Sequence, residues 1–395
     1  MKTGKNFPVL YWVVVAVTLA LGAVGFYWRL SAGHRMANYG ELIVWGLWVA
    51  TYIFFVGISA GSFVIAALVY VFDIERFRPI APLALLVSLI TLPVGLLNIW
   101  VDLGHMERFY ELYVRPSLVS IMSVEVWLYT AFLIVLVAII WLEFFRKAAS
   151  EEEQRSGRLA VRVLSAIGLV LVILFEGAGG ALYGVAAARP AWHGGLFPLL
   201  FILSAMVVGT ALLAGIYAFF SSERGTERHR QVMVDLGKLM LGLVVMEVLF
   251  TFSEYSIAFY GSVPSEIEPL KVILTGPFWY VFWIGQVGLG MVLPIVLLVW
   301  SRTREEPLWI GVAGLGVVIA TFAMRLNIVI PALALPELEG LINATPSPRI
   351  TTSYVPSSME WFVAIGTVGL ALALFAIGYS LLPVEPQQEK EVSHG

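Results

Sequence analysis

Long apolar runs constrain this chain more than any other feature, because about 20 apolar residues suffice to cross a lipid bilayer as a helix. Backbone polar groups must be satisfied within the hydrocarbon, so runs of this length predict helices without lipid-exposed loops between their ends. We therefore expect an all-α, polytopic membrane helix bundle of about ten transmembrane helices. The ten runs cover roughly 8–28, 42–72, 80–101, 118–145, 159–185, 195–220, 232–260, 276–300, 308–330 and 355–382.

The composition excludes several classes of function. Only 13% of the residues are charged and 59% are hydrophobic, whereas a soluble domain normally carries about 25% charged residues. The net charge of −3 gives no indication of nucleic-acid binding. The sequence has no cysteine, which excludes disulfides and thiolate-held iron–sulfur clusters, and its five histidines avoid the middles of the runs. We expect no metal, no haem and no other cofactor bound by this chain.

Lysine and arginine are distributed unevenly between the two sides of the predicted bundle. Sixteen lie on the side of both termini and seven on the opposite side. Positive charges accumulate in cytoplasmic loops. The bias predicts a multi-pass protein of the inner (cytoplasmic) membrane with both termini in the cytoplasm. The first run lacks a small-residue cleavage site, so we expect a retained helix rather than a signal peptide.

The order of the runs predicts one integral membrane domain over residues 1–395. Small residues four positions apart predict close helix contacts at Gly57 and Gly61, and at Gly180 and Gly184. The expected parts are a first four-helix bundle at about 42–185, a second at about 195–330, flanking helices at 8–28 and 355–382, and a cytoplasmic tail at 383–395.

Charged side chains inside the runs are functional candidates, because each costs about 2.5–3.5 kcal/mol at the centre of a membrane helix. Glu247 and Glu254 are seven residues apart, so they share one helix face and lie about 10 Å apart along the axis. Such a ladder favours a proton route, although Arg325 could instead neutralise one carboxylate as a structural ion pair. The predicted proton route comprises Glu176, Glu247, Glu254, Arg325 and Glu360.

Most of these charges fall in the middle or outer half of the membrane. Asn98, Asp102 and His105 add polar groups at the outer end of the third run, and Glu125 lies in the outer half of the fourth. A polar pocket near the outer surface suits a lipid-soluble redox substrate whose chemistry moves protons. It suits a solute transporter equally well.

Several short motifs resemble, in order and spacing, those of the NrfD/PsrC family, the membrane subunits of polysulfide reductase-type complexes. The resemblance extends over nearly the whole chain from about residue 40, and the later motifs are similar to the longer, ten-span members, which include the hydrogenase membrane subunit group. Met106 departs from the family pattern, which has a proline in this loop. The motifs are DLGHMER (102–108), SIMS (120–123), ARPAW (188–192), GLFPLLFILSAMVVGTAL (195–212), RLNIVIP (325–331) and YVPSSMEW (354–361).

The resemblance implies a quinone-reactive membrane anchor subunit of a multisubunit respiratory oxidoreductase, without redox centres of its own. It implies menaquinone or ubiquinone as substrate, with exchange of electrons between the quinone pool and a partner. The implied partners are a four-cluster iron–sulfur, ferredoxin-like subunit and a molybdopterin or other catalytic subunit, with membrane lipid around the chain. The quinone site would lie in the first four-helix bundle, toward the outer face.

Carried over by position, the site residues fall at the outer ends of the second to fifth runs. Tyr52 stands where some shorter members have a quinone-binding histidine. We expect chemistry at Glu125, Asp102 and His105, and quinone contacts from Tyr52, Asn98, Tyr183 and Arg189. Two alternatives stay open: a secondary transporter, for which Pro93 and Pro294 would break helices, and a passive anchor without a quinone site.

Overall fold

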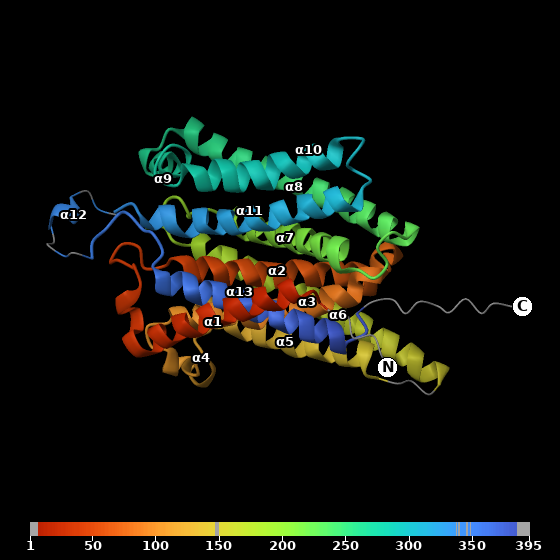
Figure 1. The fold of residues 1–395 in the computed structure, drawn as a ribbon. Coiled ribbons are helices and arrows are strands. Elements are labelled where there is room, and N and C mark those ends of the chain that lie inside the picture. The colour runs from red at the N-terminus through yellow and green to blue at the C-terminus, as the bar shows by residue number, and fades with distance from the viewer. Residues whose placement is uncertain are drawn as a thin grey trace, which may run out of the picture.

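The computed structural model describes residues 7–146, 150–336, 338, 340–344, 347 and 349–384, and this part of the chain contains helices but no strand. The long helices lie side by side along a common axis, and the loops gather at the two ends (Figure 1). Nine of the described helices are long and apolar enough to cross a membrane. The prediction of an all-α, polytopic membrane bundle is confirmed.

The long helices are α1 (Val9–Ala32), α2 (Leu47–Tyr70), α3 (Ala81–Asp102), α5 (Ile121–Phe144), α6 (Glu151–Gly184), α7 (Phe197–Phe220), α8 (Glu227–Gly261), the π-helical η4 (Val281–Val292) continued by α10 (Leu293–Val299), α11 (Pro307–Leu333) and α13 (Ser358–Leu381). Short helices connect them: η1 (Gly33–Met36), η2 (Glu75–Ile80), η3 (Met106–Arg108), α4 (Glu111–Val114), α9 (Pro264–Leu274) and α12 (Leu341–Ala344).

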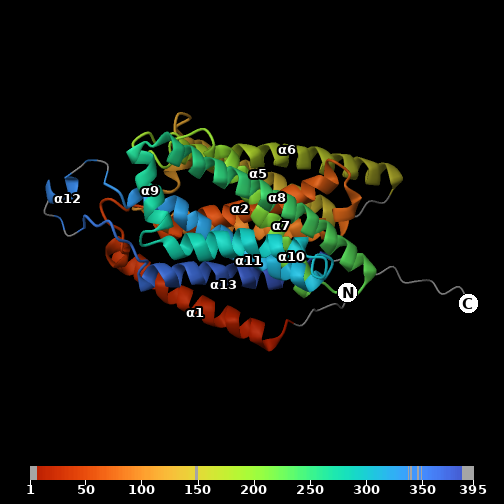
Figure 2. The ribbon, with the colours of Figure 1, turned by 90° about the horizontal axis from the view of Figure 1, so that it is seen from above.

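The run expected at 232–260 lies within α8, a helix of 35 residues that is not one of the nine. It nevertheless runs the length of the bundle, because α7 ends at one end and α9 begins at the other (Figures 1 and 2). Its first turns carry the charged segment Glu227–Arg230. α8 therefore supplies the remaining expected passage through the bundle.

Helix contacts group the long helices into two rings. In the first ring α2 contacts α3, α3 contacts α5, α5 contacts α6 and α6 contacts α2. In the second, α7, α8, α10 and α11 contact one another in the same way, and α7 and α11 also pack on α2. α1 pairs with α13, and α13 lies against α3. The predicted limits at 42–185 and 195–330 stay a prediction, and residues 385–395 of the expected tail lie outside the described residues.

The two ends of the bundle differ in character. We call the end with η1, η3, α4, α9 and α12 the loop end, and the opposite end the basic end (Figure 1). The basic end includes Arg146, Arg155, Arg158, Arg224 and Arg302. Phe7 packs there against Tyr379, so the first and last described segments meet at this end. By the distribution of positive charge, the basic end is the predicted cytoplasmic end.

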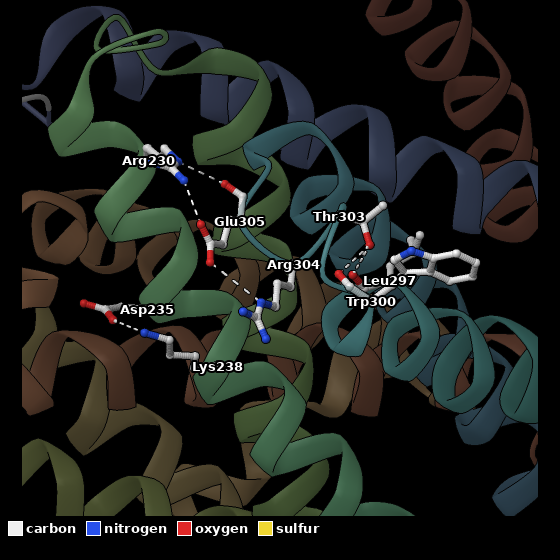
Figure 3. A network of polar contacts seen from close by, with 8 residues as sticks. All are labelled: Arg230, Asp235, Lys238, Leu297, Trp300, Thr303, Arg304 and Glu305. Carbon is white, nitrogen blue, oxygen red and sulfur yellow. Dashed lines mark hydrogen bonds and ion pairs between the residues drawn. The ribbon is translucent and has the colours of Figure 1, made fainter.

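Polar contacts at the basic end tie the start of α8 to the turn between α10 and α11 (Figure 3). Arg230 Nη2 lies 2.8 Å from Glu305 Oε2, and Arg304 Nε lies 3.7 Å from the other oxygen of Glu305. Exposed ion pairs of this kind contribute little to stability. They fix the turn relative to the helix rather than hold the bundle together.

We call the interface between the two rings, where α7 and α11 pack on α2, the seam. Glycines allow the helices to approach closely there. A Cβ atom on Gly61 of α2 would lie 1.7 Å from the Ala205 carbonyl oxygen of α7, and one on Gly209 would lie 2.2 Å from the Gly61 carbonyl carbon. Gly180 of α6 meets the backbone of Phe197 in the same way, at 2.5 Å. These distances bear out the close helix contacts expected at Gly61 and Gly180.

The seam yields a test of the fold. Gly61→Ala should lower the midpoint of thermal unfolding of the detergent-solubilised protein, because the added methyl group must push α2 from α7, at a cost of about 1–3 kcal/mol. Gly242→Ala on α8 is the matched control, since a Cβ there meets no atom within 4 Å. Equal midpoints for the two variants would contradict this packing.

Candidate functional site

A cavity of about 780 Å³ lies between α2, α3, α5 and α6 near the loop end. Its walls are mainly apolar and aromatic, and Pro93 of α3 lies on its wall. Few polar side chains reach it, which is typical of a site for a largely apolar small molecule. Those that do include Tyr52, Asp102, Glu125, Tyr129 and Tyr183.

On one side of the cavity, three buried side chains form a hydrogen-bonded chain. The Tyr52 hydroxyl on α2 lies 2.7 Å from the Tyr129 hydroxyl on α5, and Tyr129 donates to Glu125 Oε1. Tyr129 follows Glu125 by four residues, so both project from one face of α5. A Cβ on Gly179 of α6 would lie 3.0 Å from the same carboxylate oxygen, so this glycine leaves room for Glu125. The chain can pass a proton between the cavity and the carboxylate.

Asp102 supplies a second carboxylate at the end of α3. Its Oδ1 accepts a 2.8 Å hydrogen bond from Tyr39, which lies in the segment between η1 and α2. Burial, together with the nearby Asp102 carboxylate, raises the pKa of Tyr39 well above its ordinary value, so its phenol stays a donor. Arg29 of α1 donates to the Val101 and Leu103 carbonyls at 2.8 and 2.7 Å. It places a buried positive charge beside Asp102 and satisfies the end of the helix.

Arg325 lies fully buried on α11, at the seam between the two rings. Its Nη2 donates to Ser204 Oγ at 2.7 Å, and its guanidinium lies 4.4 Å from the centre of the Phe201 ring. Its Nε and Nη1 atoms have no hydrogen-bond partner, and neither does Glu176 Oε1. Within the described residues Arg325 forms no direct ion pair, but it interacts electrostatically with Glu176 on one side and Glu247 on the other. The alternative that Arg325 only neutralises a carboxylate therefore stays open, although no direct contact with one is seen among the described residues.

The two glutamates of α8 face separate spaces. Glu247 borders a small cavity together with Gln286 of η4, whose Oε1 accepts a 3.1 Å hydrogen bond from Asn327. Glu254 borders a second cavity, of about 280 Å³, at the loop end between α8, α9 and the connection from α6 to α7. Buried polar side chains are therefore present in the second ring as well, at Glu247, Gln286 and Asn327.

Three of the expected site residues do not line the large cavity. His105 is exposed, with its Nδ1 atom 2.9 Å from Glu107 Oε1. Asn98 is buried against α13, where its carbonyl oxygen accepts from Thr367 at 3.3 Å. Arg189 donates to the Ala332 and Leu335 carbonyls at 3.2 and 2.7 Å, so it fastens the loop after α6 to the end of α11.

Glu360 is placed differently from the other carboxylates of the predicted proton route. It forms a capping box with Ser357 at the start of α13. Its oxygens also accept hydrogen bonds from the backbone of Asn38 and from the Tyr354 hydroxyl. These bonds connect the loops at both flanking helices, and they give each carboxylate oxygen at least one donor.

The sequence analysis did not predict two residues of the site, Tyr129 and Tyr39. Tyr129 carried a usable signal, because it is one helical turn from Glu125 on an otherwise apolar helix. Tyr39 carried none, because it is a loop residue that meets Asp102 only through the fold. Of the expected residues, Tyr52, Asp102, Glu125 and Tyr183 are brought together at one cavity.

Comparison with known proteins agrees with the resemblance seen in the motifs. The family described as "Polysulphide reductase, NrfD" matches residues 35–337. The chain is 33% identical to a selenate reductase subunit of Mesobacillus selenatarsenatis, covering 98% of this chain and 97% of that protein. It is 26% identical to the Hdr-like menaquinol oxidoreductase integral membrane subunit of Archaeoglobus fulgidus (99% and 98%). It is 21% identical to the menaquinone reductase integral membrane subunit of Nitratidesulfovibrio vulgaris (94% and 92%).

These relatives are subunits of oxidoreductases, and they match this chain over nearly its full length. With the profile match over most of its residues and its polytopic helical fold, the chain belongs to the NrfD polysulphide reductase family of membrane subunits.

Proposed function

We propose that this chain is the quinone-reactive membrane subunit of a multisubunit oxidoreductase. The observation that carries the proposal is the 780 Å³ apolar cavity with carboxylates on two of its walls, Glu125 and Asp102. A quinone needs an apolar space for its ring and tail, and a few polar groups for its two oxygens. The names of two full-length relatives include menaquinol or menaquinone, which supports the same substrate class.

The redox step moves two protons and two electrons. Oxidation of a bound quinol breaks two O–H bonds and forms two C=O bonds. The two electrons would leave one at a time, through iron–sulfur clusters of a partner subunit, and the two protons would pass to protein groups. We assign one proton to Glu125, through the Tyr52–Tyr129 chain, and the other to Asp102. Reduction of a quinone runs through the same groups in reverse.

The proposed complex needs redox partners, because this chain has no cysteine to hold a cluster. An iron–sulfur, ferredoxin-like subunit would dock at the loop end, where the cavity lies, and would connect to a molybdopterin or other catalytic subunit. The charge distribution supports a cytoplasmic membrane location with the basic end facing the cytoplasm. Docking would then occur on the opposite side.

We also propose that protons move between the two rings. Glu176, Arg325 and Glu247 form a buried series of charged groups across the seam, and Glu254 continues it toward the second cavity. The unpartnered nitrogens of Arg325 and the free oxygen of Glu176 support a hydrated interior, since buried polar groups without protein partners are usually satisfied by water.

Glu125→Gln tests the proton acceptor at the quinone. Quinol-dependent turnover of the purified complex should fall by about 100-fold or more, because general acid–base groups typically contribute 10²–10⁴-fold. His105→Ala is a first control, and it also tests the role in the chemistry that the sequence analysis expected for His105. Glu107→Gln is a second control. Both residues are exposed outside the cavity and should leave turnover within about twofold. If the double variant Glu125→Gln with Asp102→Asn kept full turnover, the proposal that quinone reacts in this cavity would be wrong.

Tyr39→Phe tests the positioning of Asp102. The variant loses a hydrogen bond to a carboxylate, which is typically worth about 1.5–3 kcal/mol, so turnover should fall at least tenfold. Tyr354→Phe removes the same hydroxyl group from another tyrosine, but this tyrosine is more deeply buried and its hydroxyl bonds Glu360 instead. The Tyr354→Phe variant should lower the midpoint of thermal unfolding and leave quinol-dependent turnover nearly unchanged. The proposed role of Tyr39 fails if both variants show the same ratio of lost turnover to lost stability.

Glu247→Gln tests the proton route separately from the redox chemistry. In proteoliposomes, electron transfer from quinol should continue, while the number of protons translocated per electron should fall at least severalfold. Glu268→Gln on α9 is the control, because this glutamate is exposed and does not line the second cavity; it should leave the ratio unchanged. An unchanged proton-to-electron ratio in Glu247→Gln would contradict the route. Solute uptake by the chain alone would instead support the transporter alternative.

A further inference from the structure

A second large cleft, of about 570 Å³, opens at the basic end of the first ring. Its walls come from the last residues of α2, from η2, from the end of α5 and from the first turns of α6. It therefore lies at the opposite end of α2, α5 and α6, three of the four helices that enclose the 780 Å³ cavity. The arginines that line it are Arg78, Arg146, Arg155, Arg158 and Arg162.

Positive charge exceeds negative charge in this cleft. Its acidic lining residues are Asp73, Glu143 and Glu153, against five arginines. Asp73 is held by Arg162. Arg155 and Arg158 stand one turn apart on α6, and neither forms an ion pair with another described residue. Two guanidinium groups are therefore available to an anion at the mouth of the cleft.

The cleft also has an apolar side. Val69, Leu142, Leu159 and Val161 contribute to its lining. Leu159 is 61% exposed, and nearby apolar side chains on the outer faces of α5 and α6, Trp141 and Val163, are 57% and 49% exposed. An apolar outer surface of membrane-crossing helices faces lipid chains. Basic side chains and a lipid-facing surface thus meet at one opening.

We propose that this cleft binds an anionic phospholipid, with its phosphate between the arginines of α6 and its acyl chains along α5 and α6. Arginine forms paired hydrogen bonds with phosphate oxygens. Basic pockets between membrane helices at the cytoplasmic side bind such head groups. A free phosphate ion offers the same oxygens but has no chains to cover Leu159. The inference stands independently of the quinone proposal.

The test measures lipid binding to the purified full-length protein by native mass spectrometry, with titration of cardiolipin, phosphatidylglycerol or phosphatidylcholine. Arg155→Gln combined with Arg158→Gln should weaken binding of the two anionic lipids about 25-fold, at about fivefold per arginine. Binding of phosphatidylcholine should not change. The control is Arg224→Gln combined with Arg302→Gln, at the basic end but outside the cleft, which should bind anionic lipid like the original protein.

A further variant separates a lipid from a free anion. Leu159→Gln should weaken cardiolipin binding severalfold and leave the binding of inorganic phosphate unchanged. Helix content and unfolding temperature check that every variant is folded. The proposal is overturned if the double arginine variant keeps its affinity, if the control pair loses as much, or if inorganic phosphate binds as tightly as cardiolipin. Binding of an acidic peptide in preference to every lipid would overturn it as well.

Discussion

The free-energy cost of a carboxylate in hydrocarbon governs the arrangement of this protein. At the loop end the structure bonds each of three carboxylates directly to a tyrosine, and at Asp102 the charge of Arg29 lies nearby as well. Tyr129 bonds Glu125, Tyr39 bonds Asp102 and Tyr354 bonds Glu360. A phenol can bond either protonation state of a carboxyl group, whereas a directly paired arginine favours only the charged one. This pairing supports the proposed proton exchange at Glu125 and Asp102.

The interior of the first ring is closed below the large cavity. Phe132 packs edge-on against Phe63 and Phe175, with ring centres 4.9 and 5.3 Å apart, and Tyr129 lies directly against Phe175. This aromatic layer separates the cavity from the cleft at the basic end. In the proposed route, a proton leaving Glu125 away from the loop end would therefore move sideways, toward the seam. Gly57 leaves space at the seam for Arg325, whose Nη2 would lie 3.4 Å from a Cβ there.

Hydropathy was sufficient to predict the fold class, because the bilayer dictates the length and the pattern of its helices. The placement of polar residues was harder to predict. Asn98 lies one turn before Asp102, and only the docking of α13 turns its amide toward Thr367. Tyr39 reaches Asp102 across 63 residues of chain, which no local pattern encodes. Glu125 was expected from its position in a long apolar run and Tyr52 from the family resemblance, and both line the large cavity.

Ionisable groups of the two rings lie within electrostatic reach of one another at the seam. Glu176 interacts electrostatically with both Glu125 and Arg325, and Arg325 in turn with Glu247. Charge interactions extend further in a low-dielectric interior than in water. Under the proposed function, these interactions would couple the charge of Glu125 to the second ring without a direct ion pair between Arg325 and any described carboxylate. The glycine contacts of α2 with α7, at Gly61 and Gly209, are what bring the two rings this close.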